Sequence, residues 1–140
     1  MLNDESGYVR REVINNSNFD NEDIIENAAY NDLNPAVRDA AVSNIHLHNE
    51  SVLIYLVKND SSRFVQLNAI KNPNLKDEDF LGDIARNHPD PAFRKNAVMN
   101  INFKNEELLR YLAENDEDVM VKIDAEYKLK NLGKEEIKYS

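Results

Sequence analysis

The chain has 140 residues, of which 41% are hydrophobic and 31% are charged, with three Gly, four Pro and no Cys. This composition is too apolar for a disordered chain and too poor in turn residues for an all-β sandwich, and the lack of Cys excludes disulfides and thiolate metal sites. The formal net charge of −9 opposes binding to nucleic-acid phosphates and to anionic lipid surfaces. We therefore predict one all-α domain over residues 1–140.

The N-terminal residues do not resemble a signal peptide. They read MLNDESGYVRRE, which is polar and acidic where a signal peptide has a basic region followed by an apolar run. No other stretch approaches the roughly 20 apolar residues that span a bilayer. We expect a cytoplasmic protein that does not bind membranes.

Equivalent residues recur every 28 positions along the whole chain without an insertion. One column is apolar, and the next holds a long polar side chain that is mostly basic. These columns are Val9, Val37, Val65, Phe93 and Val121, and then Arg10, Arg38, Gln66, Arg94 and Lys122. The period predicts full repeats at 4–31, 32–59, 60–87 and 88–115 and a capping half-repeat at 116–140.

Two helices are predicted in each repeat, here named helix A and helix B. Helix A covers 7–16 in the first repeat and 35–44 in the second, and Pro35 and Pro91 stand in a first turn, where a missing N–H is tolerated. Helix B follows a short link and begins at an Asn or Asp N-cap that is followed by acid, which suits the helix dipole. The N-caps are Asn21, Asn49, Asp77 and Asn105, and the expected ends are near Asn31, Asn59, Asn87 and Asn115.

A single helix pair cannot bury both of its faces, so neighbouring repeats are expected to stack around one elongated core. This predicts a right-handed α-solenoid of about four and a half helix-turn-helix repeats. In the last repeat, helix A is expected to run to about Lys130, and Gly133 with the tail KEEIKYS replaces helix B. The last helix A would form the polar outer surface of a cap through Asp124, Glu126, Lys128 and Lys130.

Two rows of the chain carry a family resemblance. Residues 32–60, DLNPAVRDAAVSNIHLHNESVLIYLVKND, and residues 88–116, HPDPAFRKNAVMNINFKNEELLRYLAEND, resemble the bacterial leucine-rich-repeat-variant and HEAT-like families. The resemblance implies that the Val of each Val-Arg pair enters the core and that the Arg binds the acid ending the preceding helix B. Here it implies the pairs Arg38 with Asp32, Lys122 with Asp116 and Arg10 with Asp4, whereas Gln66 and His88 interrupt the pattern in the middle rows.

Candidate catalytic and metal-binding residues have structural interpretations in the repeat. His46 and His48 could be two metal ligands with His88 as a third imidazole, but His46 and His48 occupy polar loop columns and His88 occupies a helix-ending column. The carboxylates recur at helix starts and ends, where they act as caps. The chain has neither a Gly-rich phosphate loop nor a nucleophile motif. We predict no metal, no cofactor and no enzymatic activity.

Asparagine fills two further columns. One lies near the end of helix A and one near the end of helix B, where Asn can cap a helix and adopt left-handed backbone in a tight loop. The alternative is that these stacked side chains bind an extended peptide backbone. The columns are Asn16, Asn44, Asn72 and Asn100, and then Asn31, Asn59, Asn87 and Asn115.

Function is most plausible on solvent-facing columns that vary from row to row. In HEAT-like solenoids the second helices line the concave surface, so the resemblance places a binding groove on the helix B face. The alternative for Tyr55 and Tyr111 is that each leans over a neighbouring repeat and packs there. The candidate partner-binding residues are Ile54, Tyr55, Lys58, Arg86, Arg110 and Tyr111.

The favoured function is a non-catalytic scaffold that binds a protein or peptide with its concave helix B face. The acidic balance favours a basic partner, and the protein is expected to be a monomer or a weak dimer. The alternative is a small-molecule-binding or enzymatic HEAT-like protein that uses the groove as a pocket. Nucleic-acid binding is less favoured, because Lys58, Arg86 and Arg110 would have to outweigh the nearby acids.

Overall fold

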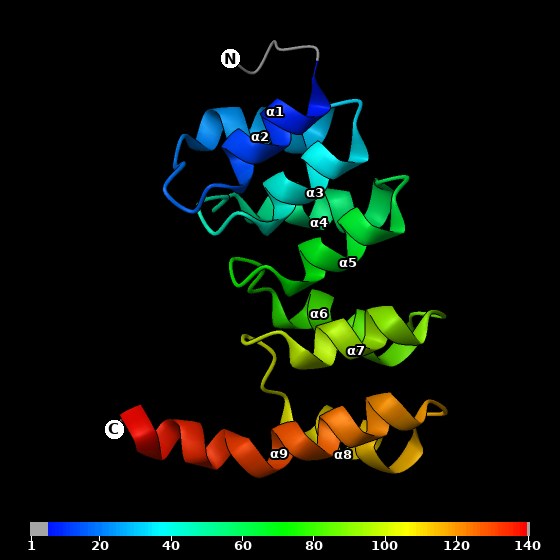
Figure 1. The fold of residues 1–140 in the computed structure, drawn as a ribbon. Coiled ribbons are helices and arrows are strands. Elements are labelled where there is room, and N and C mark those ends of the chain that lie inside the picture. The colour runs from blue at the N-terminus through cyan, green and yellow to red at the C-terminus, as the bar shows by residue number, and fades with distance from the viewer. Residues whose placement is uncertain (1–5, 140) are drawn as a thin grey trace. The chain divides into compact units, whose positions relative to one another are not determined.

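The described part of the chain is all helical and contains no β-strand. The computed structural model describes residues 6–139, and side chains are described up to residue 132. The all-α prediction is confirmed for this part. Its helices are α1 (Gly7–Asn15), α2 (Glu22–Asn31), α3 (Pro35–Ser43), α4 (Glu50–Asn59), α5 (Arg63–Lys71), α6 (Glu78–Asn87), α7 (Pro91–Met99), α8 (Glu106–Asn115) and α9 (Val119–Tyr139) (Figure 1).

The predicted helix boundaries agree with the structure except at the last helix. Helix A corresponds to α1, α3, α5 and α7, and helix B to α2, α4, α6 and α8, which end at the four predicted asparagines. The expected end near Lys130 is wrong, because α9 continues through Gly133 to Tyr139. A single Gly costs a helix only about 1 kcal/mol relative to Ala and does not end it alone. No helix within residues 6–139 has the length and apolarity needed to cross a membrane.

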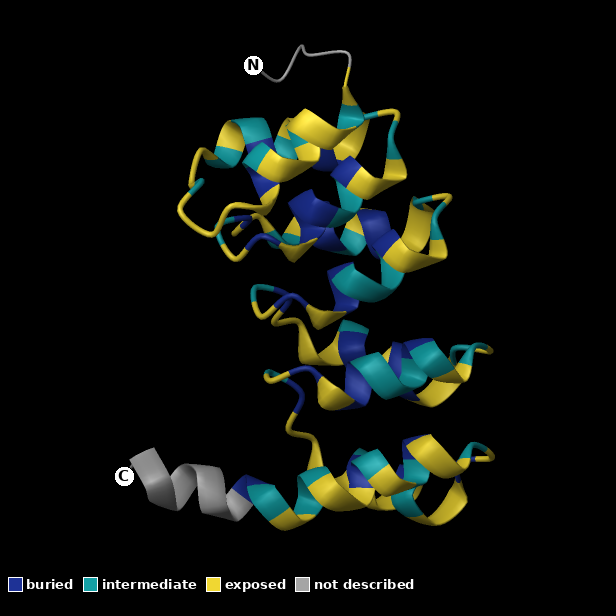
Figure 2. Cartoon of the chain, in the orientation of Figure 1, coloured by how far each residue is buried: buried dark blue, intermediate teal, exposed yellow. Residues whose placement is uncertain are grey.

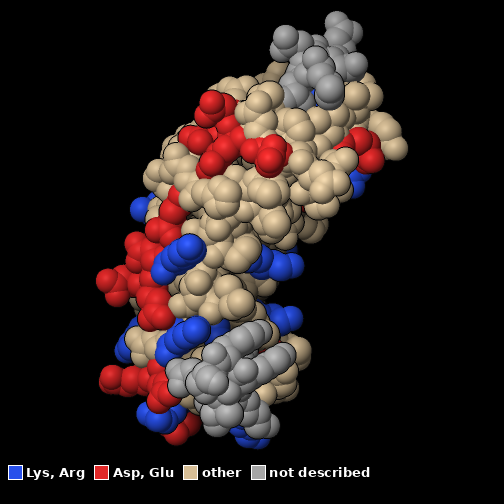
Figure 3. Space-filling view, turned by 90° about the vertical axis from the view of Figure 1, so that its left-hand side faces the viewer, with Lys and Arg blue, Asp and Glu red and all other residues tan. Residues whose placement is uncertain are grey.

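Each helix B begins at the predicted N-cap, where the side chain accepts a backbone N–H of the first turn. The caps are Asn21, Asn49, Asp77 and Asn105. The next acid also reaches the following row: Glu22 Oε1 accepts the His48 N–H at 2.7 Å, and Glu78 Oε1 accepts the Lys104 N–H at 3.1 Å. Carboxylates occupy the first turns of these helices, and clusters of Asp and Glu side chains are visible on the face drawn in Figure 3. The helix dipole and these bonds together account for the recurring acid.

The chain divides into two compact units, Met1–Leu75 and Lys76–Ser140, here called the N-terminal and C-terminal units. In the N-terminal unit, α3 contacts α1, α2 and α5, and α4 contacts α2 and α5. In the C-terminal unit, α7 contacts α6 and α9, and α8 contacts α6 and α9. Within each unit, helix A therefore packs on the helix A of the next row.

The predicted core columns are buried between the helices of each unit (Figure 2). Val37, Val65 and Val121 are fully buried, but Val9 of the first row is 38% exposed. The apolar residue of the link follows the same pattern, since Leu47 is fully buried and its first-row equivalent is only half-buried. No row precedes this one among the described residues, so these two side chains lack the cover that their equivalents in the next row receive.

The asparagine column at the end of helix A joins one row to the previous one. Asn44 Nδ2 donates to the carbonyl oxygens of Ile14 at 2.9 Å and Phe19 at 3.2 Å, and its Oδ1 accepts the His46 N–H. Asn72 Nδ2 makes the equivalent bond to the Val42 carbonyl at 2.8 Å. The architectural interpretation of this column is confirmed, and its buried members are not open to a peptide backbone. This arrangement satisfies carbonyl groups that the end of a helix leaves without partners.

The expected left-handed backbone at these asparagines is wrong. No described residue has a positive φ, and the C-cap Asn44 is extended, with φ of −77° and ψ of 125°. The turn instead forms through the side-chain oxygen, which accepts the N–H two residues later. The second column makes bonds within its own helix, as when Asn59 Nδ2 donates to the Tyr55 carbonyl at 3.0 Å.

The last row differs from the polar cap that the sequence predicts. Lys128 replaces the asparagine of the column, and its ammonium points inward to donate to the carbonyls of Val98 and Asn100. On the outer surface Ile123 is 50% exposed and Tyr127 is 60% exposed. The expectation of a polar outer surface is therefore wrong for Lys128 and for Asp124, whose Oδ2 is buried, whereas Glu126 and Lys130 are exposed as expected. That surface is partly apolar.

Replacing Asn44 with Ala is expected to lower the free energy of unfolding by about 2–3 kcal/mol, because it leaves buried carbonyls without donors. Asn16→Ala is the matched control, because Asn16 is exposed and its Oδ1 bonds only the nearby Asn18 N–H. That variant should lose less than about 1 kcal/mol. Urea unfolding curves measure both, and equal losses would contradict the role assigned to Asn44.

Candidate functional site

Bidentate ion pairs fix the junction between helix B and the following helix A. Arg38 Nε and Nη2 bind the Asp60 carboxylate at 2.9 and 3.2 Å, and the two side chains are 12% and 3% exposed. The pairs Arg10 with Asp32 and Arg94 with Asp116 have the same geometry. In all three, the separation along the chain is the same, and the aspartate ends the helix B that follows the arginine.

The expected pairing register is therefore wrong. Arg38 binds the carboxylate of Asp60, and it reaches Asp32 only at the main-chain carbonyl, at 2.9 Å. Asp116 is bound by Arg94 and not by Lys122, and Asp32 is the partner of Arg10, while Asp4 lies outside the described residues. The physical reason is that helix A packs on the next helix A, so its arginine faces the aspartate that leads into that next helix.

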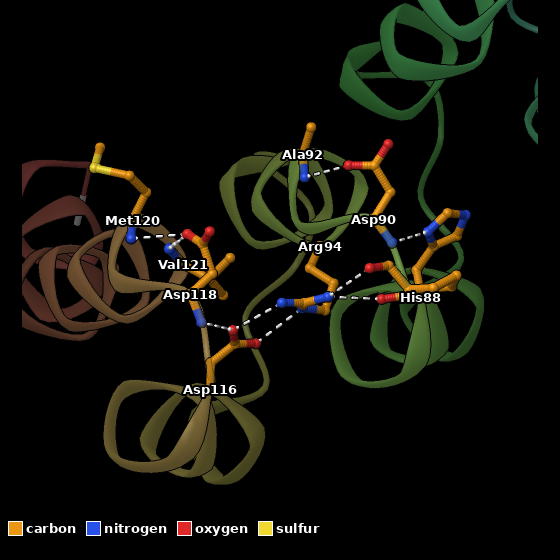
Figure 4. A network of polar contacts seen from close by, with 9 residues as sticks. His88, Asp90, Ala92, Arg94, Asp116, Asp118, Met120 and Val121 are labelled. Atoms are coloured by element: carbon orange, nitrogen blue, oxygen red, sulfur yellow. Dashed lines mark hydrogen bonds and ion pairs between the residues drawn. The ribbon is translucent and has the colours of Figure 1, made fainter.

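The ion pairs are saturated with hydrogen bonds. Arg94 lies between the Asp116 carboxylate and the carbonyl oxygens of His88 and Pro89, to which its Nη1 donates at 2.8 and 3.3 Å (Figure 4). Asp116 also accepts the Asp118 N–H. These groups hold the chain in place and have little capacity left for a ligand.

The aspartate at the end of the first helix B shows the effect of this network on its pKa. Burial raises the pKa of Asp32, but the hydrogen bonds from Arg10 and from the Asn34 N–H outweigh it and keep the pKa below its ordinary value. The charged form is therefore the stable one in the folded protein.

Gln66 and His88, which interrupt the pattern, have local partners. Gln66 Nε2 donates to the Val57 carbonyl at 2.8 Å. His88 Nδ1 accepts the Asp90 N–H at 3.0 Å, and its ring stacks on Phe93 with centroids 4.0 Å apart. Burial lowers the pKa of His88, the charge of Arg94 acts in the same direction, and Asp90 opposes them. His88 thus supplies the same turn acceptor as the aspartate it replaces.

The histidines considered as metal ligands make separate contacts. The rings of His46 and His48 are 6.3 Å apart at 76°, and His46 Nε2 lies 3.2 Å from the Ser17 carbonyl. His48 Nδ1 lies 3.4 Å from Glu22 Oε2, and both side chains are exposed. Among the residues with described side chains, no group of three His, Asp or Glu is arranged to hold a metal ion.

Two hollows of similar size lie at the ends of helix B, one in each unit. The N-terminal hollow, of about 310 Å³, is lined by Tyr30, Asn31, Asp32, Leu33, Arg38, Tyr55, Leu56, Asn59, Asp60 and Ser61. The C-terminal hollow, of about 350 Å³, is lined by Arg86, Asn87, His88, Pro89, Arg94, Tyr111, Leu112, Asn115, Asp116 and Glu117. Each residue of the second set lies 56 positions, two repeats, after its equivalent in the first. The repeat therefore builds the same hollow twice.

The predicted tyrosines Tyr55 and Tyr111 line these hollows. The Tyr55 ring packs edge-on against Tyr30, with centroids 5.2 Å apart, and the Arg86 guanidinium lies 4.7 Å from the centre of the Tyr111 ring. Each tyrosine thus leans on a residue 25 positions earlier, in the preceding row. Tyr55 and Tyr111 still expose 49% and 44% of their surface, so the packing leaves about half of each ring open to a ligand.

The other predicted site residues do not line these two hollows. Ile54 is half-buried and Lys58 is exposed on α4. Arg110 is exposed on α8 and makes a surface ion pair with Glu106 at 3.5 Å. The structure therefore brings together Arg86 and Tyr111 in one hollow and places Tyr55 in the other.

Tyr30 and Leu33 also line the N-terminal hollow, although neither was among the predicted site residues. Tyr30 shares its column with Arg86, which was selected, and so could have been found from the repeat alone. Leu33 is 95% exposed in the link between α2 and α3. A large apolar side chain in a mostly polar column was the available signal, since the column otherwise holds Glu5, Ser61, Pro89 and Glu117.

Chemically, the hollows offer aromatic rings, amide groups and charged groups at the rim, which can recognise a ligand by packing and hydrogen bonding.

No protein-family model matches the chain, and neither does any curated protein or solved structure.

A double-mutant cycle should distinguish the two registers of the ion pair. We expect a coupling energy of about 2 kcal/mol between Arg38→Met and Asp60→Asn, because the pair is nearly buried and bidentate. Coupling between Arg38→Met and Asp32→Asn should stay below about 0.5 kcal/mol. Urea unfolding measures each variant, and the reverse order of couplings would refute the observed pairing.

The low pKa of His88 predicts a pH dependence of stability. The unfolded chain, with a pKa of about 6.5, takes up the proton more readily than the folded one. The contribution of His88 is therefore complete above pH 6.5 and is lost as the pH falls through the folded-state pKa. His88→Asn keeps an acceptor for the Asp90 N–H, so the fall of the urea midpoint between pH 7.5 and 5 should become smaller; an unchanged fall would contradict this.

Proposed function

We propose that the chain is a non-catalytic module that binds a protein or peptide, built as a right-handed α-solenoid of the HEAT-like or leucine-rich-repeat-variant type. Contacts that recur from row to row within each unit support the solenoid. Helix A contacts the next helix A, each paired arginine binds the aspartate that ends the following helix B, and asparagine bonds the carbonyls of the preceding row. In this proposal the helix B face is concave and contacts the partner.

The observation that carries the proposal is that the hollow occurs in both units. The residues at its floor are the same in the two units, whereas the residues at its rim differ. Both floors contain a tyrosine, a leucine, an asparagine and the saturated ion pair. At the rim, Tyr30 corresponds to Arg86 and Leu33 to Pro89. The floor is part of the repeat and serves folding, whereas rim residues that differ between rows are available for recognition.

The N-terminal hollow fits an apolar or aromatic side chain of a partner. Tyr30, Leu33 and Tyr55 surround it, and they are 41%, 95% and 49% exposed. Its volume of about 310 Å³ is at the small end of ligand pockets and admits one large side chain. Exposed aromatic and aliphatic groups around such a hollow are typical of the anchor points of protein interfaces.

A small-molecule site is the second candidate, because both hollows fall within the volume range of ligand pockets. A cationic aromatic compound would meet the tyrosine rings and the rim acids. A thermal-shift screen of such compounds distinguishes the candidates. A compound that raises Tm in the wild type and not in Tyr55→Ala would favour a small-molecule site.

The binding function can be tested with Leu33→Ser, which introduces the residue that the next row has at this position. We expect partner capture from an extract of the source cell to fall roughly tenfold, since an apolar anchor is worth about 1–2 kcal/mol. Tm should not change, because the side chain is 95% exposed.

Phe64→Ala is the matched control, because Phe64 is 71% exposed in the same unit but lies on α5, a helix A. It should retain full capture. Equal capture by wild type and Leu33→Ser, or a loss confined to Phe64→Ala, would refute the N-terminal hollow as the binding surface.

A further inference from the structure

The C-terminal hollow presents a guanidinium group where the N-terminal hollow presents a phenol ring. Arg86 stands in the position of Tyr30, two repeats later, and packs on Tyr111 as Tyr30 packs on Tyr55. The two contacts join equivalent positions of the repeat, but an edge-on pair of rings in the N-terminal unit is replaced by a cation over a ring in the C-terminal unit.

The other donors in the C-terminal hollow have partners already. Arg94 is occupied by Asp116 and by two backbone carbonyls. Asn87 Nδ2 donates to Asp83, and Asn115 Nδ2 donates to the Tyr111 carbonyl. In contrast, no carboxylate with a described side chain lies within ion-pair distance of the Arg86 guanidinium.

The Arg86 guanidinium carbon lies over the Tyr111 ring, 4.7 Å from its centre, and this cation–π contact leaves the N–H groups available for hydrogen bonding. A planar guanidinium held in this way matches the two oxygens of a carboxylate. Because this contact is already formed in the free protein, it lowers the side-chain entropy that binding would cost.

We propose that the C-terminal hollow binds a carboxylate, the side chain of an Asp or Glu in the partner, through a bidentate contact with Arg86. This deepens the proposed function, because it names the chemistry of one partner residue. Glu117 lines the same hollow and opposes the anion, so it lowers the affinity of the site. Asp118 adds negative charge near Arg94, which disfavours a phosphate dianion more than a single carboxylate.

The test uses N-acetyl-glutamate N-methylamide as the probe and follows the Arg86 side-chain Nε–Hε resonance of the ¹⁵N-labelled chain by NMR. The uncharged control is N-acetyl-glutamine N-methylamide, and the phosphate control is N-acetyl-phosphoserine N-methylamide. We expect the glutamate probe to bind at least roughly tenfold more tightly than the glutamine probe, because the contact is charge-assisted.

Three variants test the assignment. Arg86→Tyr reproduces the tyrosine pair of the N-terminal hollow without the charge. Because this variant lacks the Arg86 resonance, the backbone amide of Asn115, which lines the same hollow, reports on binding. The shifts that the glutamate probe causes at this amide in the wild type should be absent in Arg86→Tyr. Arg86→Lys keeps the charge but loses the planar fork, so binding should weaken at least severalfold. Glu117→Ser introduces the residue found at Ser61 and should tighten binding.

Three outcomes would overturn the assignment: equal shifts with the glutamine probe, tighter binding of the phosphoserine probe, or unchanged binding in Arg86→Tyr. Far-UV circular dichroism checks that each variant is folded, and Arg86→Gln replaces Arg86→Tyr if the latter is not. Partner capture that depends on Leu33 while the glutamate probe fails would refute only the carboxylate assignment. Loss of the Leu33 dependence with a working probe would refute only the proposed function.

Discussion

The structure depends on hydrogen bonds that one row leaves open and the next row closes. Helix A ends with carbonyl groups that its own row cannot satisfy, and the asparagine of the next row donates to them from a buried position. Unsatisfied carbonyls in such a place would cost about 1–3 kcal/mol each. A row therefore reaches its full stability only beside its successor, and the ion pairs between the same rows act in the same direction.

Much of the fold could be predicted from the sequence because the same local signals recur in several rows of the repeat. The N-caps at Asn21 and Asn105, the proline at the first turn and the buried valine column are local features, and the structure has them where they were predicted. The pairing register of Arg38 was not predictable in this way. The repeat period places equivalent positions in successive rows, but it does not say whether a side chain faces the preceding row or the next one.

The candidate site was predictable only in part, for a similar reason. Tyr55, Arg86 and Tyr111 were found because aromatic and arginine side chains on a solvent-facing column are unusual. The hollow itself depends on where helix B ends and the chain turns, and it includes residues from the link such as Leu33. Polarity along a helix carries no information about such a depression, so Ile54 and Arg110 were selected for their column and lie outside it.

The exchange of asparagine for Lys128 has a consequence for the course of the backbone after it. An ammonium group donates to the carbonyls of the previous row as the asparagine amide does, but it has no oxygen to accept the backbone N–H two residues later. The turn that separates helix A from helix B in the other rows then lacks its side-chain acceptor, and the backbone continues as helix α9. One side chain thus both satisfies the carbonyls of the preceding row and removes the acceptor that forms the turn after helix A where asparagine occupies this column.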